Sequence, residues 1–192
     1  MADTDVLSYP STPPQMLDPG LRVKLSIMMF LQYAIWGAWW VVLAKYLTAI
    51  GFTGANIGSI YGTMAIASII SPLVFGQIAD RYVPTQHLLA GLHLVGGGVL
   101  FAAVRFTDFT TFHMLVLAYA LLYIPTISLT NSLSFHHLPD AARFFPGIRV
   151  FGTIGWIAAG LFVGWTLNEK STQPILLACG LSMVMGLFCF AL

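Results

Sequence analysis

Six long apolar runs separated by short polar breaks constrain the fold of this 192-residue sequence more than any other feature. A bilayer cannot satisfy backbone polar groups, and a helix of about 20 apolar residues spans its hydrocarbon core. We place the spans at about residues 25–47, 57–78, 88–104, 112–135, 146–167 and 174–192. The sequence therefore predicts an all-α membrane protein with six transmembrane helices.

The composition excludes an ordinary soluble fold. Apolar residues make up 58% of the chain and charged residues 8%, whereas soluble domains carry about 25% charge. The eight Lys and Arg are scattered singly along a chain of net charge +1, so they form no basic face for nucleic acid. We therefore expect a lipid bilayer as the environment and no nucleic-acid partner.

The chain divides into a short tail and one membrane domain. Residues 1–21 are rich in Asp and Pro and poor in apolar side chains, which predicts a disordered tail before a six-helix bundle at 22–192. Arg22 and Lys24 directly precede the first span. Because positive charges beside the first span favour the cytoplasmic side, we expect a cytoplasmic N terminus.

One cation, Arg149, lies inside an apolar run, where burial costs about 2.5 to 3.5 kcal/mol without a partner. Thr153 and Trp156 follow at i+4 and i+7 and share its helical face. A planar guanidinium, a hydroxyl and an indole on one face suit a flat, hydrogen-bonding ligand. The alternative is that Arg149 extends to the headgroups while Trp156 packs, and the spacing leaves both open.

Other polar groups within the spans are open to two interpretations. Gln32 and Trp36 are four residues apart in the first span, and Asn131 extends a stripe of Tyr and Thr in the fourth. Such stripes either contact a ligand or join helices. Gly160 and Gly164 have the G-x-x-x-G spacing that brings helices close together, within a bundle or between two copies.

Several kinds of chemistry are missing from the sequence. All seven acidic residues fall in the tail or in loops, so no span holds a proton-carrying carboxylate. His136 and His137 are adjacent, point to different helix faces and have no third ligand nearby, so we expect no metal site and no cofactor. An intramembrane protease of the rhomboid type needs a G-x-S-G serine and a later histidine, which the chain lacks. We therefore predict that it is not an enzyme.

The break between the second and third spans contains Gly76, Asp80 and Arg81. An acid-base pair at the membrane surface can lock helices in one state. At this position, the pattern resembles the G-x-x-x-D-R loop of the major facilitator superfamily. The resemblance implies a gating role for these three residues.

From Leu25 onward the chain resembles the N-terminal half of the nucleoside:proton symporters of that superfamily. The matching blocks are Leu31-Gln32, Trp36-Gly37 with Trp39, Tyr123-Ile124-Pro125-Thr126 with Asn131, and Phe145-Pro146-Gly147-Ile148-Arg149 running into Gly152-Thr153-Ile154-Gly155. The resemblance implies nucleoside transport by alternating access, with protons as the coupling ion. It also implies that Arg149, Thr153 and Trp156 bind the nucleoside, and it adds Gln32, Trp36 and Asn131 as candidates.

The resemblance covers six helices of a superfamily built from two six-helix halves. We therefore expect a fragment that lacks a C-terminal six-helix half, as a multi-pass protein of the cell (inner) membrane. Two other functions stay open: a non-transporting six-helix receptor or scaffold, and a major-facilitator transporter for another small polar solute. A nucleoside uptake assay on the complete gene separates them.

Overall fold

The computed structural model describes residues 16–192, apart from the side chains of Gln77, Ala79 and Asp80. The predicted tail at 1–21 lies mostly outside these residues, and its last residues, from Pro19 onward, belong to the first helix. The side chain of Asp80, one of the predicted gating residues, also lies outside the described part.

Seven α-helices and one short 3₁₀ helix make up the described chain. They are α1 (Pro19–Trp39), α2 (Leu43–Ala49), α3 (Gly54–Arg81), α4 (Thr85–Ala103), α5 (Phe109–His137), α6 (Ala141–Thr166), α7 (Gln173–Phe188) and η1 (Cys189–Ala191). Together α1 and α2 form one candidate span of 31 residues, and the other long helices supply five more. The six transmembrane helices predicted from the sequence are therefore confirmed.

Acidic residues in the loops start three of the helices. Asp18, Asp108 and Asp140 precede α1, α5 and α6, and each carboxylate accepts a hydrogen bond from the backbone N–H three residues later, at 2.7, 2.8 and 3.0 Å. At Asp108 this bond from Thr111, together with the Thr111 hydroxyl, lowers the pKa of the carboxyl. These side chains satisfy N–H groups that helix starts leave free, which explains why the acids sit at the ends of the apolar runs.

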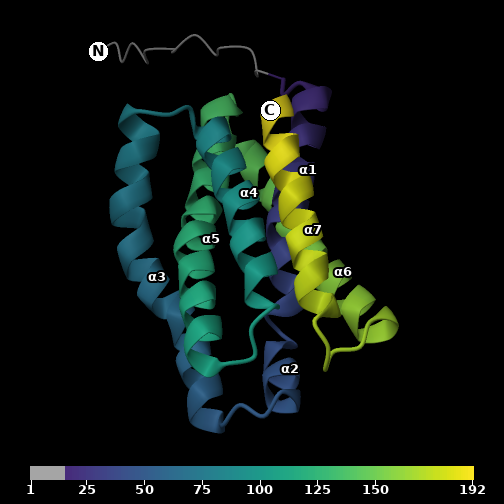
Figure 1. The fold of residues 1–192 in the computed structure, drawn as a ribbon. Helices are drawn as coiled ribbons and strands as arrows, with labels where there is room; N and C mark the ends of the chain where they lie inside the picture. Colours follow the sequence, from purple (N-terminus) through teal and green to yellow (C-terminus); the bar gives the residue numbers. More distant parts are fainter. Residues whose placement is uncertain (1–15) are drawn as a thin grey trace, which may run out of the picture.

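The helices form one bundle (Figure 1). Helix α1 packs chiefly against α6 and α7, while α4 packs against α5 and α7, and α3 packs along α5 at one edge. Figure 1 shows α1 beginning and α7 ending at the same end of the bundle, with α2 at the opposite end. We call these the terminal end and the α2 end.

Glycines bring α1 and α6 into backbone contact. A Cβ added to Gly155 would lie 2.2 Å from the carbonyl oxygen of Phe30, and one added to Gly37 would lie 2.5 Å from that of Trp156. At Gly160, one of the two glycines of the G-x-x-x-G pair, the nearest atom would be 3.9 Å away. The close approach therefore depends on Gly37 of α1 and Gly155 of α6. Gly160, which the G-x-x-x-G spacing had singled out, makes no comparably close contact.

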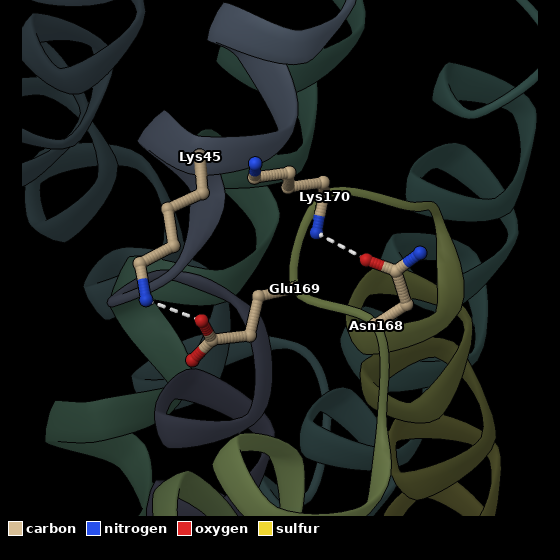
Figure 2. Close-up of polar contacts among 4 residues, drawn as sticks. All are labelled: Lys45, Asn168, Glu169 and Lys170. Atoms are coloured by element: carbon tan, nitrogen blue, oxygen red, sulfur yellow. Dashed lines mark hydrogen bonds and ion pairs between the residues drawn. The ribbon is translucent and has the colours of Figure 1, made fainter.

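At the α2 end an ion pair joins helix α2 to the loop between α6 and α7, which is far away in sequence (Figure 2). Lys45 of α2 pairs with Glu169, which follows α6, and the backbone N–H of Lys170 donates to the Asn168 side chain at 3.0 Å. The Lys45 side chain is 56% exposed, so water screens the pair and its contribution to stability is small. It links α2 to the α6–α7 connection.

Candidate functional site

A cavity of about 350 Å³ lies between α1 and α6, in the size range of small-molecule sites. Its lining is aromatic apart from one arginine and one threonine. The residues are Tyr33, Trp36, Trp40, Arg149, Thr153 and Trp156. The first three follow each other at i+3 and i+7 and the last three at i+4 and i+7, so each helix presents a single face to the cavity.

Arg149 is held over an aromatic ring. Its guanidinium carbon lies 4.0 Å from the centre of the Tyr33 ring, a cation–π contact, and Tyr33 is itself only 9% exposed. A Cβ at Gly152 would lie 2.7 Å from Arg149 Nη1 and 2.7 Å from the Tyr33 ring. Glycine at this position leaves space for the guanidinium beside the Tyr33 ring.

The guanidinium has no carboxylate partner among the described residues, where the ion pair found is that of Lys45. A cation–π contact still leaves N–H groups of the guanidinium able to donate hydrogen bonds to a ligand. The donors therefore border a cavity that also holds the Thr153 hydroxyl. Such an arrangement can bind a neutral ligand that is rich in acceptor oxygens or nitrogens.

The indoles of the cavity are fixed to different degrees. The Trp40 ring packs edge-on against Trp39 at 5.3 Å and Tyr61 at 4.7 Å, and the Trp36 ring packs against Tyr123 at 6.4 Å. The Trp156 side chain is 42% exposed. Two walls are thus held by their neighbours, while a third keeps free surface on which a planar group can stack.

Gln32 is not in the cavity. It is fully buried, its amide nitrogen donates to Thr126 Oγ1 at 2.7 Å, and His93 Nε2 lies 2.9 Å from its amide oxygen. The Tyr123 hydroxyl donates to the Gln32 backbone oxygen at 2.6 Å. Gln32 therefore joins α1 to α4 and α5, and the structure favours helix joining over ligand contact for this residue.

Asn131 and the predicted gating residues also lie apart from the cavity. Asn131 is on α5 and does not line the cavity, and its Oδ1 is buried without a partner in the described residues. Gly76 and Arg81 lie in the last turns of α3, at the terminal end. A gating role for them stays a prediction.

The structure thus brings together Trp36, Arg149, Thr153 and Trp156 of the six predicted binding residues. Sequence reasoning missed Tyr33 and Trp40, which complete the lining. The signal for both was present, because they lie three residues before and four residues after Trp36 and so share its face of the helix.

Comparison with known proteins gives consistent relatives. The putative nucleoside transporter YegT of Escherichia coli (strain K12) is 44% identical over 176 residues, which are 88% of this chain and 41% of the relative. The xanthosine permease of the same organism is 38% identical over 177 residues, covering 90% and 42%. The crystal structure of the nucleoside transporter NupG matches with a TM-score of 0.86 at 32% identity, covering 90% of this chain and 44% of that one.

The chain therefore spans less than half the length of these relatives, and the structural match confirms the predicted N-terminal half of a major-facilitator fold. A family model described as nucleoside H⁺ symporter matches residues 20–192, which is nearly the whole chain. These are transporters, in agreement with the prediction that the chain is not an enzyme. The chain belongs to the nucleoside H⁺ symporter family.

Proposed function

We propose that this chain is the N-terminal half of a proton-coupled nucleoside transporter that works by alternating access. In this proposal the cavity between α1 and α6 is its side of the nucleoside site. The observation that carries it is the pairing of Arg149 with the Tyr33 ring beside free aromatic surface, in a chain whose relatives are nucleoside transporters.

The chemistry of a nucleoside matches this cavity. Its base is planar and carries acceptor atoms, and its sugar carries hydroxyls. The Arg149 fork donates to base or sugar acceptors, the Thr153 hydroxyl donates or accepts, and Trp156 offers a stacking surface. The base and the sugar of a nucleoside carry no net charge. A neutral ligand fits an arginine whose charge is already partly stabilised by the Tyr33 ring.

The proton carrier and the opposite wall of the site belong to a second half of the protein in this proposal. The described carboxylates lie at helix ends or in loops, as Asp18, Asp108, Asp140 and Glu169 do. Transporters of this class bind substrate between two halves, and the relatives are more than twice as long as the chain. The missing carboxylate is therefore assigned to the C-terminal half.

The finer localisation is part of the same proposal. We place the chain in the inner membrane with the terminal end of the bundle facing the cytoplasm, because Arg22 and Lys24 begin α1 there and Arg81 and Arg143 lie at the same end. The end of α3 with Gly76 and Asp80, together with the connection to α4, would then be a cytoplasmic gate.

The test compares three variants of the full-length protein that contains this chain. Arg149→Lys keeps the charge but loses the planar fork, so nucleoside affinity should fall at least about tenfold, the equivalent of one charge-assisted hydrogen bond. Thr153→Ala should also weaken binding. Arg143→Lys is the matched control, because Arg143 is an exposed arginine near the start of the same helix and outside the cavity.

Affinity is measured by calorimetry at matched expression and thermal stability. Wild-type affinity in both Arg149→Lys and Thr153→Ala would show that the cavity is not the nucleoside site. A loss in Arg143→Lys equal to that in Arg149→Lys would show that arginine substitutions in α6 act through the fold.

A further inference from the structure

The first transmembrane span is interrupted beside the cavity. Helix α1 ends at Trp39, the residues 40–42 form turns, and α2 resumes at Leu43. In a continuous α-helix the N–H of Ala44 would donate to the carbonyl oxygen of Trp40, four residues earlier. This bond is among those that the interruption opens.

A tyrosine hydroxyl from another helix occupies the open bond. Tyr61 of α3 accepts a hydrogen bond from Ala44 N–H at 3.1 Å and donates one to the Trp40 carbonyl oxygen at 2.9 Å. A single hydroxyl therefore satisfies both the donor and the acceptor of this one open bond. Insertion of a side chain into the helical ladder is an established cause of a helix kink.

The same tyrosine also holds the side chain of Trp40. The two rings pack edge to face with their centres 4.7 Å apart and their planes at 64°. Trp40 in turn lines the cavity opposite the α6 residues Arg149 and Trp156. The backbone and the indole of Trp40 are thus both fixed by Tyr61, which itself does not line the cavity.

We propose that Tyr61 is a positioning residue of the nucleoside site, whose inserted hydroxyl keeps the first span open at Trp40 and so holds the Trp40 indole as a stacking wall. This inference rests on the proposed function. Without the hydroxyl, Ala44 N–H and the Trp40 carbonyl oxygen lose the partner that they share. Closing the bond between them would then shift the backbone at Trp40 and turn its indole.

The experiment uses Tyr61→Phe in the full-length protein, because phenylalanine keeps the ring against Trp40 and removes the hydroxyl. Nucleoside affinity should fall about tenfold, the scale of one base-stacking contact. In a Trp40→Ala background, the same Tyr61→Phe change should have no further effect, since the wall that Tyr61 positions is already gone. Tyr46→Phe is the matched control, because Tyr46 is a buried tyrosine of α2 that lies outside this hydrogen bond.

Two results would overturn the inference. Wild-type affinity in Tyr61→Phe would show that the hydroxyl does not position the site. An equal loss in the wild-type and Trp40→Ala backgrounds would show that Tyr61 supports the fold rather than Trp40.

The outcome is separable from that of the proposed function. If Arg149→Lys weakens binding and Tyr61→Phe does not, the inference on Tyr61 fails alone. If Arg149→Lys and Thr153→Ala both keep wild-type affinity, the nucleoside site is wrong and the role of Tyr61 falls with it.

Discussion

Replacing Gly155 by alanine tests whether backbone contact between α1 and α6 builds the site. The added Cβ would lie 2.2 Å from the Phe30 carbonyl oxygen, whereas an ordinary contact begins at 3.4 Å. The other close atoms, the carbonyl carbon and the Cα of Phe30 at 2.9 and 3.0 Å, are also backbone. No side-chain rotation relieves the overlap, so the two helices must separate by about 1 Å.

The expected cost has two parts. Overpacking of this kind destabilises a protein by about 1 to 3 kcal/mol, which lowers the temperature of unfolding. Separation also moves Arg149 and Thr153 away from Tyr33 and Trp36, and displacements of about 1 Å in a positioned site commonly cost a hundredfold in function. We therefore expect nucleoside affinity to fall by at least tenfold in the folded variant.

Gly160→Ala is the matched control. It makes the same substitution in the same helix, but its nearest neighbour is the Gly37 oxygen at an acceptable 3.9 Å. Alanine should be neutral there or stabilise α6 by up to about 1 kcal/mol, because it has the higher helix propensity. The assays are thermal unfolding followed by tryptophan fluorescence and nucleoside binding by calorimetry. Equal unfolding temperatures and affinities in Gly155→Ala and Gly160→Ala would refute the reasoning.

Four further outcomes are expected. Gln32→Leu leaves buried His93 without its amide partner and should destabilise the protein by about 1 to 3 kcal/mol in thermal unfolding; an unchanged unfolding temperature would contradict the buried network. Lys45→Ala removes an exposed ion pair and should cost less than about 1 kcal/mol, so a larger loss would mean that the pair is not screened. In intact cells, an impermeant thiol reagent should label a cysteine placed at Thr107 and should not label one placed at Thr85, at the opposite end of the bundle. The reverse pattern would reject a cytoplasmic N terminus. Residues 1–192 alone should not accumulate nucleoside in liposomes with a pH gradient, and robust accumulation would show that two copies of this half suffice.

The number and order of the spans could be predicted because hydrophobicity alone determines which segments enter lipid. Helix ends were less predictable, since they depend on capping. Helix α6 begins at Ala141 rather than near residue 146, because Asp140 caps it before the apolar run starts. The interruption after Trp39 could not be predicted, because the hydroxyl that opens it belongs to Tyr61 on the next span.

The lining of the cavity was predictable on α6 and less so on α1. Arg149 is conspicuous because a cation within a span needs a partner, and helical periodicity then placed Thr153 and Trp156 beside it. Its partner turned out to be the ring of Tyr33, which no charge pattern indicates. The glycine that admits this contact, Gly152, lies in the block that carries the family resemblance, so part of that block preserves space rather than ligand contacts.

Gln32 and Trp36 show what helical periodicity can predict about side-chain contacts and what it cannot. Their spacing of four residues placed them on one side of α1, yet Trp36 lines the cavity toward α6 while Gln32 reaches α4 and α5. Helical spacing gives the relative direction of two side chains but not the neighbouring helix that each one meets. One turn of 5.4 Å along α1 is enough to pass from one neighbour to another. On a helix surrounded by others, each polar residue must therefore be assigned from its own partners, and His93 with Thr126 makes Gln32 part of the bundle that holds the site in place.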